Sequence, residues 1–227
     1  MIRVRLTYSK RGRACFIPHI AIPTVLARSA ARAAIGFRLS EGFTPRPKIS
    51  LGPELSVGVP ALAEPFEAWL TGYDEDTPRR WNLFLPEGFS ITGSTVVEGL
   101  PGTEEAKSLG KWCRASSCIL ALRGGEPGTV LHECLEELKN EGTVLSFGRG
   151  RDLPAGFYRL VMENPAQKGP GVLVKALAAR GIVAGWPDVF ILREAVGSLS
   201  LREDGEEPRV LPLAEPLAAA VGEDRRA

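Results

Sequence analysis

The chain has 227 residues, of which 44% are hydrophobic and 24% are charged, and its formal net charge is +1. This composition is typical of a globular protein and excludes a disordered or fibrous chain. No apolar run approaches the ~20 residues that span a bilayer, so we expect no membrane partner. The first residues, MIRVRLTYSKRGR, lack the apolar segment of a secretory signal, and we therefore expect a cytoplasmic location.

Positive charge is concentrated in the first fifty residues. They carry ten lysines and arginines against the single acid Glu41, a local charge of +9 that the rest of the chain offsets with −8. Such polarity points to an electrostatically steered partner, most often a nucleic acid. The alternative is a solvated basic face that is balanced by an acidic domain.

The residue pattern predicts the same order of elements twice, namely strand, helix, strand, strand, helix, strand. In the first half the predicted elements are a strand at 2–7, a helix from Pro23 to a stop at Gly36, strands at 47–52 and 64–71, a helix from Thr77 to Leu85 and a strand at 89–98. After a predicted linker at 99–111 they are a strand at 112–122, a helix opened by Pro127, strands at 143–147 and 156–162, a helix at 171–180 and a strand at 188–199.

This order predicts an α+β protein with two tandem ferredoxin-like (βαββαβ) units and antiparallel sheets. The expected domains are a basic unit at 1–98, a second unit at 112–200 and a tail at 201–227.

Several cations are candidates for contact with phosphate. Arg3 and Arg5 would lie on the sheet face that the helices leave open, where they would meet phosphates or the contact between the two units. The other candidates are Lys10, Arg11 and Arg13 around Gly12, Arg28 and Arg32 on one helix face, and Arg46 and Lys48 in the stretch LSEGFTPRPKISLGP.

That stretch predicts a stiff cationic loop, because Pro45 and Pro47 restrict the backbone on either side of Arg46. A loop that is already stiff loses less entropy when it grips a phosphate. Phe43 beside it would stack on a base or fill the core beneath the loop.

His19 is the one candidate for a general base, because imidazole titrates near neutral pH. We favour a structural or phosphate-contacting role for it, since no second histidine or paired carboxylate is near it in sequence. The four cysteines, Cys15, Cys113, Cys118 and Cys134, have no metal-site spacing and are expected to be reduced and buried. We expect no metal and no cofactor.

One region resembles a known family. YSKRGRACFIPHIAI and LARSAARAAIGFRLSEGFTPRPKISLGPELSVGV resemble the radical-SAM-linked protein family, a bacterial domain of unknown function fused to, or encoded beside, cobalamin-type radical S-adenosylmethionine (SAM) proteins. The matching positions are Tyr8, Lys10, Gly12, Phe16, His19, Arg28, Arg32, Ser40, Gly42, Phe43, Pro45, Pro47, Lys48, Ile49 and Ser50.

The chain departs from the family pattern at Ala21, where the family has aspartate, and at Thr44 and Arg46, where it has asparagine and histidine. These losses argue against an acid–base role for the motif, whereas Arg46 strengthens its cationic character. The resemblance implies a radical SAM protein encoded nearby as a partner. The gene neighbourhoods of the family favour RNA over DNA.

We therefore expect a non-catalytic RNA-binding or substrate-presenting partner of a radical SAM enzyme, in tRNA or rRNA metabolism. One alternative is a metal-independent endoribonuclease that uses His19. The other is a structural subunit whose basic surface docks an acidic protein. The sequence shows no catalytic constellation, so we do not favour an enzyme.

Overall fold

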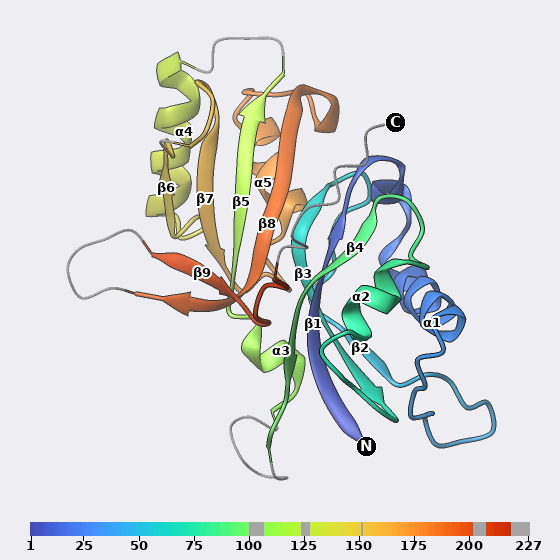
Figure 1. Ribbon diagram of the computed structural model, residues 1–227. Helices are drawn as coiled ribbons and strands as arrows, with labels where there is room; N and C mark the ends of the chain where they lie inside the picture. The colour runs from blue at the N-terminus through green and yellow to red at the C-terminus, as the bar shows by residue number, and fades with distance from the viewer. Residues whose placement is uncertain (100–106, 124–127, 151, 202–207, 219–227) are drawn as a thin grey trace.

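The computed structural model describes residues 1–99, 107–123, 128–150, 152–201 and 208–218 (Figure 1). In this part of the chain, five α-helices accompany one large, mostly antiparallel sheet. The structure therefore confirms the mixed class of helices and antiparallel sheet that the sequence predicts. None of the described helices is long and apolar enough to cross a membrane.

The first half of the chain forms four strands and two α-helices. In chain order they are β1 (Ile2–Lys10), α1 (Ile22–Arg32), β2 (Ile49–Leu51), β3 (Ala61–Leu70), α2 (Thr77–Asn82) and β4 (Phe89–Val96), with short 3₁₀ turns η1 (Gly12–Phe16) and η2 (His19–Ala21) before α1. In space the strands lie in the order β4, β1, β3, β2, and each pair is antiparallel.

The second half repeats this arrangement. Its elements are β5 (Ala115–Leu122), α4 (Gly128–Asn140), β6 (Ser146–Gly148), β7 (Tyr158–Glu163), α5 (Pro170–Ala179), the 3₁₀ turn η3 (Trp186–Asp188) and β8 (Val189–Ser200). The strands lie in the order β8, β5, β7, β6, again antiparallel. Pro127, which the sequence predicts as the helix start, lies outside the described residues.

The two halves share one sheet, which the sequence does not predict. β3 pairs with β8 in parallel, with Ala61 opposite Arg193 and Ala63 opposite Ala195. The final strand β9 (Arg209–Pro212) pairs with β8, and Pro216 then bridges to Gly93 on β4. The described part of the C-terminal segment therefore contacts both halves.

Each half has its own core beneath its two main helices. Val4, Leu6 and Tyr8 point from β1 toward α1 and α2, because successive side chains of a strand point to opposite faces. The second core lies among α4, α5 and their strands. It also takes Leu55 and Ala61 from the first half, so the boundary between the halves is buried.

Two local predictions are wrong in detail. The first helix ends at Arg32 instead of reaching Gly36, because Ala34 already has the left-handed φ of 55°. The amide of Ile35 then donates to the carbonyl of Ala30, a bond that commonly closes a helix end. The predicted start of the fifth strand at Trp112 instead ends the short helix α3 (Leu109–Trp112), which packs through Leu109 against Val196.

A buried ion pair joins the halves next to the β3–β8 pairing. Nε of Arg193 donates to Oε1 of Glu64 at 2.6 Å, and Nη2 bonds to Oε2 of the same carboxylate. The side chains are only 0% and 3% exposed. The carbonyl oxygens of Glu54 and Pro53 accept one further guanidinium proton each, at 3.1 and 3.0 Å. The charges are therefore both paired and hydrogen-bonded, as burial requires.

We expect Glu64→Gln or Arg193→Met to lower the free energy of unfolding by about 3–5 kcal/mol, because each leaves one buried charge without its partner. Urea unfolding followed by circular dichroism measures this loss. The double variant Glu64→Leu/Arg193→Met should recover most of it, since both charges are then absent.

Arg80→Ala is the matched control, because its partners Asp74 and Asp76 are exposed. It should cost at most about 1 kcal/mol. Equal losses in the free energy of unfolding for Arg193→Met and Arg80→Ala would show that burial of the Glu64–Arg193 pair does not increase the cost of breaking it.

Candidate nucleic-acid interface

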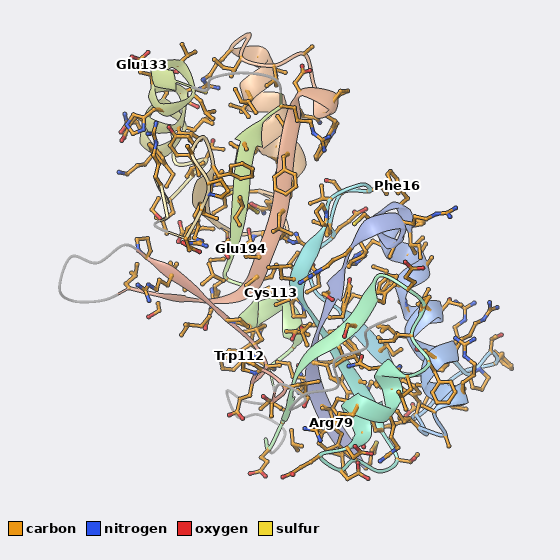
Figure 2. All side chains as sticks on the ribbon, turned by 45° about the horizontal axis from the view of Figure 1, so that its top comes forward. Phe16, Arg79, Trp112, Cys113, Glu133 and Glu194 are labelled. Atoms are coloured by element: carbon orange, nitrogen blue, oxygen red, sulfur yellow. The ribbon has the colours of Figure 1, made fainter. Side chains whose placement is uncertain are left out.

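Arg3 and Arg5 lie on the sheet face opposite α1 and α2, where both bind Glu67. Nη2 of Arg3 donates to Oε2 of Glu67 at 2.7 Å, and Nη2 of Arg5 donates to Oε1 at 2.8 Å. Their guanidinium groups also lie over indole rings, that of Arg3 over Trp69 and that of Arg5 over Trp112 of α3. Figure 2 shows Trp112 between the two halves. The sequence allows these arginines to meet phosphates or to line the contact between the two units. In the structure both bind Glu67, and Arg5 also packs on Trp112.

Lys10 and His19 lie at the junction beside the Glu64–Arg193 pair. Lys10 is fully buried, its Nζ donates to the carbonyl of Ile17 at 3.3 Å, and burial lowers its pKa. His19 is half-buried, and its Nδ1 is buried without a hydrogen-bond partner among the described residues. Of these two positions of the family motif, Lys10 is therefore part of the interior and His19 is partly withdrawn from solvent.

Burial is also the main cause that holds the pKa of His19 below its ordinary value. The carboxylates of Glu54 and Glu64 oppose this effect, while the charges of Arg193 and Lys10 reinforce it. A neutral imidazole can accept a proton and act as a general base, and a neighbouring carboxylate would assist it. The carboxylate of Glu64 is already bound by Arg193. Only Glu54, which is exposed, remains as an acidic neighbour of His19 in the described chain.

Four of the predicted cations are exposed around the start of the chain. Arg11 and Arg13 flank Gly12 directly after β1, and Gly12 adopts a left-handed φ of 54°. Arg28 and Arg32 extend from α1, and Nη2 of Arg32 donates to the carbonyl of Phe84 at 3.0 Å.

The segment 39–48, called the proline loop below, projects beyond the end of α1 (Figure 1). Its two ends are held together, because Leu39 bridges to Pro47 and the amide of Ser40 donates to the carbonyl of Arg46 at 2.7 Å. In return the amide of Arg46 donates to Oγ of Ser40 at 3.1 Å. Hydrogen bonds and prolines together brace the base of the loop.

Phe43 at the tip of the proline loop is fully exposed. It therefore does not fill the core, which is one of the two roles that the sequence allows. Arg46 on the same loop is also exposed, whereas Nζ of Lys48 lies 4.5 Å from the centre of the Trp69 ring. The loop thus offers one aromatic ring and one solvent-facing guanidinium.

The structure places two of the predicted cations, Lys48 and Arg11, toward opposite ends of β1. Lys48 lies beside Trp69, which pairs with Arg3 at the start of β1, whereas Arg11 follows the end of that strand. The nine residues of β1 separate these two ends by about 30 Å. The sequence cannot reveal this separation, because the two groups are close only along the chain.

The described residues contain no group of three histidine, cysteine, aspartate or glutamate side chains that could hold a metal ion. The four cysteines are buried and form no disulfide. Burial raises the pKa of Cys113 and of Cys118 to about 12, so both thiols stay protonated at neutral pH.

Sequence reasoning missed Glu67, which binds Arg3 and Arg5, and the Glu64–Arg193 pair, which lies beside Lys10 and His19. A signal for Arg193 exists, because it is a charged residue within the apolar run DVFILREAVGSL. An arginine that faces a core must find an acid, but nothing in the sequence says which one.

The lowered pKa of His19 predicts a pH dependence of stability. Between that pKa and the ordinary value of 6.5, the unfolded chain binds a proton that the folded protein does not. The free energy of unfolding should therefore be at its full value above pH 6.5 and should fall as the pH decreases below it. Urea unfolding at pH 7.5 and 5.5 measures this change, and His19→Gln should reduce it.

His132→Gln is the matched control, because His132 lies on α4 in the second half, away from the junction. A pH dependence that is the same in the original protein and in His19→Gln would contradict the assignment of this effect to His19.

Comparison with known proteins adds one finding. No curated protein matches this sequence. A family model described as an uncharacterized protein conserved in bacteria (DUF2344) matches residues 3–144, which include the whole first half, α3, β5 and α4. Because this match covers more than half of the 227 residues, the chain belongs to the DUF2344 family.

Proposed function

We propose that this protein binds single-stranded RNA through the proline loop and has no catalytic activity of its own. The observation that carries the proposal is the full exposure of Phe43 on a braced loop that also presents Arg46. A large apolar side chain at such a tip is available to a ligand, and every RNA base offers a flat face to stack on it. Arg46 would contact the phosphate next to the stacked base.

The hydrogen bonds at the base of the loop support this proposal energetically. The backbone of the loop is already ordered, so binding loses less conformational entropy than it would with a flexible segment. The exposed cations Arg11, Arg13, Arg28 and Arg32 would add a long-range field that attracts a polyanion. They form two pairs, one at the turn after β1 and one on α1, and would act by steering the polyanion toward the protein.

The finer parts of this proposal rest on the order of the elements and on the family resemblance. We infer that the two halves are tandem ferredoxin-like units, because the order of elements and the order of strands are the same in both. The family resemblance supports a radical SAM enzyme as the partner to which RNA is presented, and RNA metabolism as the process. The four free, buried cysteines support a cytoplasmic location.

Two alternatives have weaker support. An endoribonuclease role would use His19 with Glu54, but Nδ1 of His19 is buried and the neighbouring carboxylate of Glu64 is occupied. A protein-docking role is favoured by Leu83 and Phe84, two exposed apolar side chains after α2. It would use a surface other than the tip of the proline loop.

Phe43→Ala should weaken binding of a single-stranded RNA of about 12 nucleotides by ~1–3 kcal/mol, because one stacked base is lost. Arg46→Ala should flatten the slope of log affinity against log salt by about 0.7, which is the share of one phosphate contact on a single strand. Fluorescence anisotropy of labelled RNA between about 50 and 200 mM salt measures both quantities.

The matched controls remove similar groups elsewhere. Leu83→Ala deletes another exposed apolar side chain, and Lys175→Ala removes an exposed charge on α5 in the second half. Affinity losses as large in these controls as in the loop variants would count against the proline loop as the binding site.

A further inference from the structure

A second candidate site lies where the two halves meet on the surface. An open groove of about 680 Å³ runs between η1 and the segment 57–60 of the first half and the segment 186–191 of the second half. Figure 2 labels Phe16 at this end of the first half, opposite the end that carries Arg79. The volume lies in the range of small-molecule sites, which are typically ~300–1,000 Å³.

The walls of the groove are aromatic, and both halves contribute to them. Phe16 is 70% exposed and Trp186 is 42% exposed, so each presents a ring to solvent at the groove. Phe190 and Val57 add apolar surface. Exposed apolar side chains gathered at one groove are typical of surfaces that contact a ligand.

The charges at the groove have one sign. Arg123 is its only charged lining residue in the described chain, and Nε of Arg123 donates to the carbonyl of Val189 at 2.9 Å, which fixes the guanidinium at the wall. Gly12 lines the groove and also a smaller hollow of about 230 Å³ between Arg11 and Arg13. Glu87 borders that hollow but not the groove itself.

We propose that this groove binds a nucleotide, with the base against Phe16 and Trp186 and the phosphate near Arg123 or the Arg11–Arg13 turn. A planar, largely apolar ring system joined to an anion fits both the walls and the charges of the site. The inference rests on the proposed RNA binding in one respect, because the nucleotide is either a free molecule or one unit of the bound RNA.

Isothermal titration calorimetry with AMP, UMP and adenosine tests this site. AMP and UMP should bind, and adenosine should bind more weakly because it lacks the phosphate. Phe16→Ala and Trp186→Ala should each weaken AMP binding about 5- to 100-fold, the usual share of one stacked base, whereas Trp186→Phe should retain most of it. Absence of binding by both AMP and UMP, or affinities unaffected by both alanine variants, would overturn the inference.

Two further arms separate this inference from the proposed RNA binding and identify the source of the nucleotide. Phe43→Ala, which alters only the proline loop, should leave AMP binding unchanged. If Phe16→Ala weakens AMP binding but leaves RNA affinity unchanged, the groove binds a free nucleotide. If Phe16→Ala weakens the binding of both AMP and RNA, the groove binds one nucleotide of the RNA strand. RNA binding that depends on Phe43, without any binding of AMP or UMP, would refute the groove and leave the proline loop standing.

Discussion

The ion pair between Glu64 and Arg193 is the interaction on which the arrangement of this protein depends. It lies where β3 and β8 pair, and it connects side chains that are 129 residues apart in the sequence. The carbonyl oxygens of Pro53 and Glu54 accept two more hydrogen bonds from Arg193, so the segment between β2 and β3 is fixed by the same guanidinium. A buried charge pair of this kind adds little net stability over apolar side chains, but breaking it is costly. It therefore selects one relative position of the two halves.

This relative position of the two halves creates two unusual environments among the described residues. Lys10 is buried and His19 half-buried beside the pair, and their pKa values are lowered mainly because burial removes water from them. On the surface above the same junction, η1 and the segment 57–60 meet the segment 186–191 and form the aromatic groove. Both features need the two halves together, and neither belongs to one half alone.

The basic first segment shows how similar residues come to have different roles. Arg3 and Arg5 share the carboxylate of Glu67, which offsets one of their two charges, and their guanidinium groups pack on tryptophan rings. Arg46 lies on a loop that hydrogen bonds hold away from the sheet, so it stays exposed. The difference is set by the position of an acid on the neighbouring strand, since a buried arginine is stable only where a carboxylate can reach it.

The sequence by itself determined the order of the helices and strands other than α3 and β9, the face of β1 that carries Arg3 and Arg5, and the stiffness of the proline loop. These properties follow from periodicity and from proline, which act over a few residues. Only the tertiary structure decided that the two sheets join through β3 and β8, that Phe43 is exposed, and that Lys48 and Arg11 lie toward opposite ends of β1. The physical reason is that pairing between strands and between buried charges joins residues far apart in the chain, where no local pattern records the partner.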